Sequence, residues 1–227
     1  MAVSSDVTSA ALARSVLADQ VRERLLERIL SGQYPPDARI VETQVARELG
    51  TSQAPVREAL RGLEALGVVE ITPFRGARVR RPTRTELLEA YAVRSALETL
   101  AARLAVPRLT DDDLATLGAA VDEMQAAAGR GDRHAVAEAD ARFHGTIVEL
   151  AGNATLVKVW RSLEPYLRTY LTLVVPGADT RWAADLHAPV FDALTARDGH
   201  AVARALERHF QEVSDNMASR LAEEATR

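Results

Sequence analysis

Residues 42–66 read ETQVARELGTSQAPVREALRGLEAL, and this stretch decides the fold of the N-terminal part of the chain. A short helix is expected from Glu42 to Leu49, and Gly50 closes it because glycine readily adopts the left-handed conformation of a tight inter-helix turn. A second helix carries Pro55 in its first turn, where the missing N–H removes no helical hydrogen bond. Two helices joined by such a turn form the helix-turn-helix pattern.

Apolar residues continue this pattern on both sides of the stretch. An earlier helix ends before the pair at residues 35–36, because two prolines cannot continue it. Its apolar face is formed by Val16, Val21, Leu25, Leu26 and Ile29. After the stretch, residues 68–71 and 77–80 are typical of two strands, with a turn at residues 73–76 between them. We therefore expect a two-stranded wing.

Charge differs between the two parts of the chain. Residues 1–84 hold 13 Arg against 10 Asp and Glu, a net +3, whereas the remainder holds 15 Lys and Arg against 22 acidic residues, a net −7. A basic module joined to an acidic one fits a polyanionic partner for the N-terminal part, although chance variation of a solvated surface gives the same count. Pro82 places the boundary near residue 83, so the expected domains are 1–83 and 84–227.

Composition excludes several classes of protein. Cysteine is absent, so neither a disulfide framework nor a thiolate metal site is possible. No apolar run approaches the roughly 20 residues that span a bilayer, and the first residues lack the basic-then-apolar order of a signal peptide. We expect a cytoplasmic protein.

The second domain shows helical periodicity throughout and no strand-like segment of any length. Helices are expected at residues 86–106, 111–129, 133–151, 156–175, 181–196 and 200–223. Thr110, followed by three aspartates, is typical of a helix cap and not of catalysis. The predicted fold class is mainly α: a winged helix-turn-helix of three helices plus the wing, followed by an all-α antiparallel bundle of six or seven helices.

Four blocks in the first domain resemble, in order and spacing, the GntR family of winged-helix transcription regulators. They are QYPPDARIVE at 33–42, VARELG at 45–50, APVREALR at 54–61 and RGA at 75–77. The resemblance implies that the third helix reads double-stranded operator DNA in the major groove. One departure is Gln53, where the family usually has Arg; glutamine reads adenine edges, whereas arginine reads guanine.

The candidate DNA-binding residues lie on the third helix and at the wing tip. They are Ser52, Gln53, Arg57, Arg61, Arg75 and Gly76. Arg57 and Arg61 are four residues apart and share one helix face. A salt bridge to a neighbouring glutamate is the alternative for Arg57, and a charge in an exposed turn is the alternative for Arg75.

Four motifs in the second domain resemble, in order, the FCD effector domain of FadR-like GntR proteins. They are YAVRSALE at 91–98, DARFH at 140–144, GN at 152–153 and His209. The resemblance implies a helical bundle around a cavity for a small carboxylic acid. It also implies a divalent metal, and the residues that match its ligands are Asp140, His144, His187 and His209. Zn²⁺, Ni²⁺ or Mn²⁺ suits one carboxylate and three imidazoles.

The residues themselves point to the same cluster less sharply. Asp140 and His144 are four apart on one helix face, whereas His187 and His209 belong to two later helices. Any one of these histidines alone would be interpreted as a packed or surface residue, but four ligands together favour a metal site. His134 and His200 are expected to be exposed.

The expected function is a ligand-responsive regulator, a repressor, that binds operator DNA as a homodimer and senses a small carboxylate effector. Arg94 is the candidate to bind the effector carboxylate, with an ion pair inside the protein as its alternative. A purely structural metal site is a second hypothesis. A metal-dependent enzyme is a third, but the chain has no HExxH, no Gly-rich phosphate loop and no nucleophile elbow, so we expect no enzyme.

Overall fold

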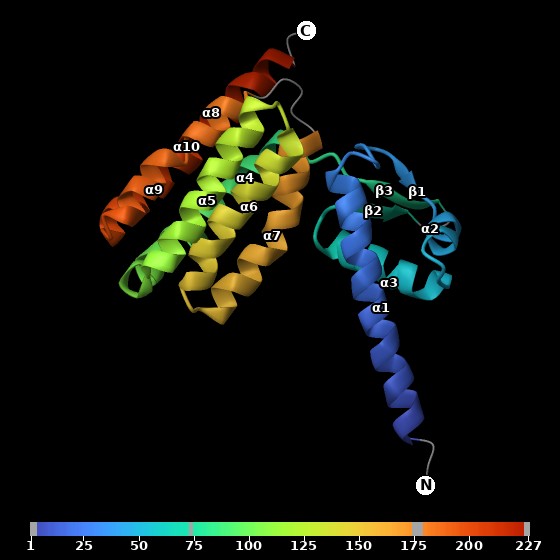
Figure 1. Cartoon of the computed structure of the whole chain (residues 1–227). Helices are drawn as coiled ribbons and strands as arrows, with labels where there is room; N and C mark the ends of the chain where they lie inside the picture. Colours follow the sequence, from blue (N-terminus) through green and yellow to red (C-terminus); the bar gives the residue numbers. More distant parts are fainter. Residues whose placement is uncertain (1–3, 73–74, 174–178, 225–227) are drawn as a thin grey trace. The chain divides into compact units, whose positions relative to one another are not determined.

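The computed structural model describes residues 4–72, 75–173 and 179–224 and divides the chain into two compact units, Met1–Arg81 and Pro82–Arg227 (Figure 1). Each unit has its own buried core. In the described part of the chain, no helix is both long enough and apolar enough to cross a membrane.

In its described residues, the first unit contains three helices, as the sequence predicts: α1 (Ser4–Leu30), α2 (Glu42–Glu48) and α3 (Gln53–Ala65). Helix α3 packs across α1. Gly50 adopts a φ of 63° in the turn before α3, the left-handed conformation expected of it. Core residues that are almost completely buried come from all three helices, among them Leu25, Ile29, Val45, Val56, Leu60 and Leu63.

The wing differs from the prediction by one strand. Strands β2 (Val69–Thr72) and β3 (Gly76–Val79) pair antiparallel as expected, but β1 (Arg39–Ile40) pairs with the other edge of β3. The sheet order is therefore β1-β3-β2. Two residues cannot show the alternation that predicts a strand, although Ile40 is fully buried and extends the core. Part of the expected turn, residues 73–74, lies outside the described residues.

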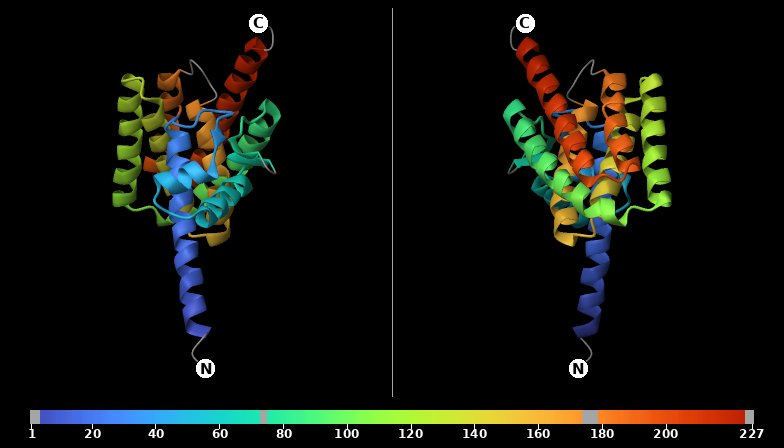
Figure 2. Two further views of the ribbon diagram at one scale, coloured as in Figure 1. Left: turned by 90° about the vertical axis from the view of Figure 1, so that its right-hand side faces the viewer. Right: turned by 90° about the vertical axis from the view of Figure 1, so that its left-hand side faces the viewer.

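The described part of the second unit is an all-helical bundle (Figure 2). Its α-helices are α4 (Arg84–Ala105), α5 (Asp111–Gly129), α6 (Arg133–Leu150), α7 (Ala154–Leu173), α8 (Thr180–Asp185), α9 (Ala188–Thr195) and α10 (Gly199–Glu224). A 3₁₀ turn at Val106–Arg108 follows α4. Helix α10 packs along α4 and α5 packs along α6, while α4 and α5 lie on opposite sides of the bundle.

One predicted helix is two helices in the structure. The sequence predicts a continuous helix over residues 181–196, but α8 ends at Asp185 and α9 begins at Ala188. Pro189 stands in the first turn of α9, where it fixes φ and cannot donate a helical hydrogen bond to the preceding turn. His187 is consequently the N-cap of α9 and not a residue within a helix.

A capping box begins α5, as the sequence predicts. The Thr110 hydroxyl accepts a hydrogen bond from the Asp113 backbone N–H at 3.2 Å, and the Asp113 carboxylate accepts one from the Thr110 backbone N–H at 2.9 Å. Each of these bonds satisfies a backbone donor that the helix itself leaves unpaired.

We expect Thr110→Ala to lower the free energy of unfolding of the second unit by about 1 kcal/mol, because a helix donor loses its cap. The melting temperature should fall by about 2–4 °C in circular dichroism. Thr116→Ala, in the exposed second turn of the same helix, is the control and should change little. An equal loss in both variants would contradict the role of the cap.

Candidate DNA-reading helix and metal-ligating cluster

The polar residues predicted to read DNA are exposed at and near the start of α3. Ser52 is the N-cap, and its hydroxyl makes no capping hydrogen bond, so it is not occupied by the helix end. Gln53, Arg57 and Arg61 are also exposed. A helix N-terminus with exposed polar and cationic side chains suits both phosphate and base-edge contacts.

Arg57 forms a salt bridge to a neighbouring glutamate, which was the alternative to DNA contact that the sequence suggested for this residue. Its Nε and a terminal nitrogen lie 3.2 and 3.0 Å from one carboxylate oxygen of Glu42, on α2. Half of the Arg57 side chain remains exposed, and such surface pairs contribute about 0–1 kcal/mol. If Arg57 exchanged its contact with Glu42 for one with a phosphate or a guanine edge, the loss of the ion pair would therefore cost little free energy.

Arg75 and Gly76 lie where the wing turns. The Arg75 side chain is exposed, and its backbone N–H donates to the Thr72 carbonyl at 3.0 Å. Gly76 has a φ of 84°, and a Cβ there would meet the Ile40 carbonyl oxygen at 3.3 Å. Glycine at this position therefore lets the start of β3 pass close to β1.

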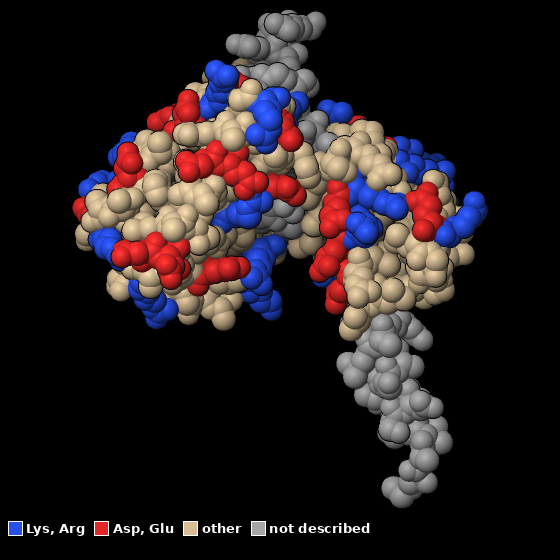
Figure 3. Space-filling view, viewed as in Figure 1, with Lys and Arg blue, Asp and Glu red and all other residues tan. Residues whose placement is uncertain are grey.

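Charged side chains of both signs are interspersed on the face drawn in Figure 3. The opposite net charges of the two parts of the chain do not form a surface of a single sign on that face.

In the second unit, the structure brings together all four predicted metal ligands. His144 on α6, His187 before α9 and His209 on α10 are 0%, 2% and 5% exposed, and one ligating atom from each lies within 4.8 Å of the others. The Nε2 atoms of His144 and His187 are 3.1 Å apart. Asp140 Oδ1 lies 3.2 Å from His187 Nε2 and 3.7 Å from His144 Nε2.

A hydrogen-bond acceptor fixes the orientation of each imidazole. Nδ1 of His144 lies against the Glu98 carboxylate, Nδ1 of His187 is 3.0 Å from the Ala183 carbonyl, and Nδ1 of His209 is 3.3 Å from the Leu186 carbonyl. With a proton on each Nδ1, the Nε2 lone pairs are free to bind a cation.

The spacing and chemistry of these donors fit a divalent metal. Two imidazole nitrogens at about 2.0–2.1 Å from one ion are roughly 3.0–3.4 Å apart, and the 3.1 Å between the Nε2 atoms of His144 and His187 falls in that range. Three imidazoles and one carboxylate suit zinc and its transition-metal neighbours better than calcium or magnesium. The residues present therefore fit the metal that the FCD resemblance implies.

The electrostatics favour the ligating protonation states. Burial lowers the pKa of His209 well below its ordinary value, and His187 and His144 lower it further. Burial also lowers the pKa of His144, although Glu98 opposes this. For Asp140, burial alone would raise the pKa, but His144, His187 and Arg94 outweigh it and hold the pKa well below the usual range. Neutral imidazoles and an ionised carboxylate are the forms that bind metals.

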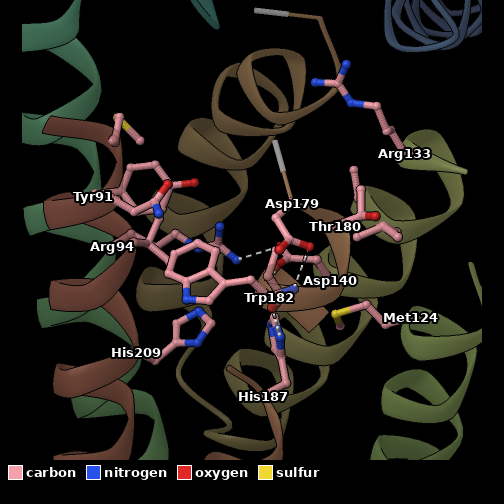
Figure 4. A pocket seen from close by; sticks show the side chains of 16 residues that line it. Tyr91, Arg94, Met124, Arg133, Asp140, Asp179, Thr180, Trp182, His187 and His209 are labelled. Atoms are coloured by element: carbon pink, nitrogen blue, oxygen red, sulfur yellow. Dashed lines mark hydrogen bonds and ion pairs between the residues drawn. The ribbon is translucent and has the colours of Figure 1, made fainter. Parts of the chain in front are cut away.

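Arg94 is 3% exposed and forms ion pairs inside the protein, which was the alternative to effector binding that the sequence suggested for it. Its Nε donates to Glu98 at 2.7 Å, and a terminal nitrogen lies 3.4 Å from the second carboxylate oxygen of Asp140. The guanidinium carbon also lies over the rings of Trp160 and Phe210, at 5.7 and 5.4 Å from their centroids. Arg94 still lines the cavity next to Asp140, so it faces both the ligand space and the protein interior (Figure 4).

Glu98 supports the cluster from behind His144, and the sequence did not predict this. It is completely buried and accepts hydrogen bonds from Arg94 Nε, from Trp160 Nε1 at 2.7 Å and from His144 Nδ1. Burial alone would raise its pKa, but His144 and Arg94 lower the pKa to about 2. Glu98 follows Arg94 by four residues, so the two lie on one helix face, and this spacing could have predicted their ion pair.

A cavity of about 100 Å³ adjoins the cluster, with Asp140, His187 and His209 in its wall (Figure 4). Most of the lining is apolar, and polar groups enter from several helices. Those that the sequence analysis did not select are Tyr91, Arg133, Asp179, Thr180, Trp182 and Asn216. His134 and His200, expected to be exposed, do not line it; His200 is exposed and His134 is half-buried beside Glu138.

A winged helix-turn-helix followed by a helical bundle is an architecture typical of DNA-binding transcription regulators. Two family models match the chain: "Bacterial regulatory proteins, gntR family" over residues 17–79 and "FCD domain" over residues 89–212. The second match covers more than half of the chain, and the protein belongs to the GntR family of transcription regulators with an FCD domain.

Individual relatives that match most of the chain are also transcription regulators. A "Probable D-xylose utilization operon transcriptional repressor" of Paenarthrobacter nicotinovorans is 38% identical over 90% of both chains. The solved structure of Escherichia coli McbR/YncC matches with a TM-score of 0.76 and 26% identity, over 90% of this chain and 98% of that one. A GntR regulator from Rhodococcus sp. RHA1, 24% identical over 89% and 97% of the two chains, shares the fold with a TM-score of 0.80. The relatives are regulators, not enzymes.

We expect Glu98→Gln to weaken divalent-metal binding about 10- to 100-fold, because a single amide oxygen cannot accept from both His144 and the Arg94–Trp160 side. Trp160→Phe is the matched control, since it removes a donor to the same carboxylate but leaves His144 its acceptor. Competition titration with a chromophoric chelator measures both affinities, and circular dichroism checks the fold. Equal metal affinity in wild type and Glu98→Gln would contradict the positioning of His144 by Glu98.

Proposed function

We propose that this protein is a metal-dependent, ligand-responsive repressor that binds its operator as a homodimer and senses a small carboxylate. The observation that carries the proposal is the convergence of three buried histidines and Asp140 in the wall of a cavity. DNA binding follows from the family, whereas the metal and the effector are inferred from this arrangement.

Zn²⁺, Ni²⁺ or Mn²⁺ is the proposed metal, held by Asp140, His144, His187 and His209. Four protein ligands leave one or two positions open on a five- or six-coordinate ion, and the bound cation attracts an anionic oxygen there. A purely structural metal site, the second hypothesis, needs no free space beside it. The cavity next to Asp140, His187 and His209 therefore favours a ligand-sensing site.

The size and lining of the cavity favour a small carboxylate that also carries hydroxyl groups. Arg94 lies beside Asp140, where a guanidinium can contact a second carboxylate oxygen. Thr180 and Asn216 supply hydrogen-bonding groups, and Trp182 supplies an aromatic face. The relative named for D-xylose utilization supports carbohydrate-derived acids as the first compounds to test.

Effector binding is coupled to the DNA-binding unit through helices that are far apart in sequence. The cluster joins α6, α10 and the start of α9, and Arg94 and Glu98 extend it to α4. Helix α4 begins three residues after Arg81, the last residue of the DNA-binding unit. A ligand that binds one arrangement of these helices more tightly shifts the population toward it.

A homodimer is the proposed DNA-binding form. One recognition helix contacts too few bases to select an operator, and two-fold symmetric proteins bind two-fold symmetric sites. Family members are dimeric, which supports the same assembly for this chain. The proposed operator is therefore a pseudo-palindrome with one half-site for each α3.

We expect Arg57→Ala to weaken operator binding by about 1–3 kcal/mol per half-site while the fold is retained, because a base or phosphate contact is lost. Gel-shift titration at fixed salt measures the effect. Arg161→Ala is the matched control: Arg161 is an exposed arginine paired with Glu149 at 2.7 Å in the second unit. Unchanged affinity of Arg57→Ala would refute α3 as the reading helix.

We expect His209→Ala to lower the metal content and to abolish the rise in melting temperature that carboxylates cause, while metal-free and ligand-free operator binding persists. Elemental analysis and a thermal-shift screen of sugar acids and of di- and tricarboxylates measure these effects. His200→Ala, an exposed histidine on the same helix α10, is the control. A full carboxylate response in His209→Ala, or wild-type protein purified without chelator and free of divalent metal, would overturn the metal-centred sensor.

A further inference from the structure

The cavity beside the metal-ligating cluster extends along one face of α6. Arg133, Val136, Ala137 and Asp140 all line it. They are spaced three, four and seven residues from the first, which places them on one side of the helix. Seven residues are about two turns, or about 10 Å along the helix axis. The cavity therefore reaches from the cluster at Asp140 to a second cationic residue, Arg133.

Helix α10 lines the same length of the cavity from another side. His209 and Asn216, also seven residues apart, both line it. Because α6 and α10 run in opposite directions, Asn216 lies toward the same end as Arg133 (Figure 1). Figure 4 shows Arg133 and Thr180 toward one end of the cavity and His209 toward the other. The end away from the metal ligands is therefore polar as well.

The wall between the two ends is apolar. It is formed by Met124, Val136, Ala137, Val213 and Met217, and all but Val213 are buried. A few polar groups at fixed places in an apolar cavity determine the orientation of a ligand. A compound that fits this cavity has a polar group at each end and carbon between them.

The guanidinium of Arg133 gives the far end its positive charge. Arg133 is half-buried, and its Nε atom has no exposed surface. Asp179, the acidic residue at this end, caps α8: its Oδ1 accepts from the backbone N–H groups of Arg181 and Trp182 at 3.0 and 3.1 Å. These donors and the start of the helix offset much of the Asp179 charge. An arginine, in contrast, stays charged and matches a carboxylate with two parallel hydrogen bonds.

We propose that Arg133 binds a second acidic group of the effector, so that the ligand carries a carboxylate at each end of a short carbon chain. The proposal rests on the metal-centred carboxylate site of the proposed function and adds what selects the far end of the ligand. One carboxylate lies at the cluster next to Asp140, the carbon chain lies along Val136 and Ala137, and the second carboxylate meets Arg133. The amide of Asn216 supplies a further donor there.

Three acids with the same carbon chain test this selectivity. Valerate ends in a methyl group, glutarate in a second carboxylate and δ-aminovalerate in an ammonium group. In isothermal titration calorimetry of the metal-loaded full chain, glutarate should bind at least about tenfold more tightly than valerate, because one charge-assisted contact is gained. δ-Aminovalerate should bind less tightly than glutarate, because its ammonium group faces the guanidinium of Arg133.

Variants of Arg133 assign the preference to this residue. Arg133→Gln should weaken glutarate binding about tenfold and leave valerate binding unchanged, because valerate has no charge for the guanidinium to contact. Arg133→Lys keeps the charge and should retain part of the preference. Arg142→Gln is the matched control, since Arg142 is an exposed arginine on the same helix, pairs with Glu123 and does not line this cavity. Circular dichroism and metal content check the fold and the cluster in each variant.

The possible outcomes separate this inference from the proposed function. Equal binding of glutarate and valerate to the wild type, or tightest binding of δ-aminovalerate, overturns the second acidic group alone. A preference for glutarate that persists in Arg133→Gln, or that Arg142→Gln also removes, overturns the role of Arg133. Binding of none of the three acids overturns the inference, and the carboxylate sensor falls with it if sugar acids also fail to raise the melting temperature.

Discussion

The second unit is organised around one buried carboxylate. Glu98 has no exposed surface, and an ionised group in such a place destabilises a protein by several kcal/mol unless donors surround it. Arg94, Trp160 and His144 supply those donors from α4, α7 and α6. These helices must therefore pack in one relative arrangement, and the imidazole of His144 is oriented as a consequence. The metal-ligating geometry depends on this interaction.

Arg94, the arginine beside the cavity, contacts two carboxylates at once. Arg94 balances the charge of Glu98 and contacts Asp140, and two aromatic rings enclose its guanidinium. An anionic ligand next to Asp140 would compete with these contacts for the same cation. A ligand bound at this position would therefore change the balance of charge inside the bundle as well as fill the cavity, and such a change would favour a different arrangement of the helices around Arg94.

Local signals in the sequence predicted most of the helices. Pro55 and Gly50 delimit α3, and Thr110 with its aspartates begins α5, because such residues determine backbone conformation by themselves. The break at Leu186 and His187, strand β1 and the role of Glu98 were not predicted. Strand β1 and the role of Glu98 depend on packing between segments distant in sequence, whereas Pro189 is a local signal for the break that the prediction of one continuous helix did not use. The four candidate ligands were selected by resemblance and spacing, and the structure added what spacing cannot give: the acceptor behind each imidazole and the cavity beside them.

Both tryptophans of the chain belong to the second unit, and both lie at the cluster. Trp160 donates to Glu98 from within the core, whereas Trp182 lines the cavity. Ultraviolet excitation of the indole rings consequently gives emission from the FCD domain alone, with the DNA-binding unit dark apart from its tyrosine. One of the two indole rings is enclosed in the core and the other lines the cavity. Their fluorescence therefore responds both to changes inside the bundle and to changes in the cavity, without any attached dye.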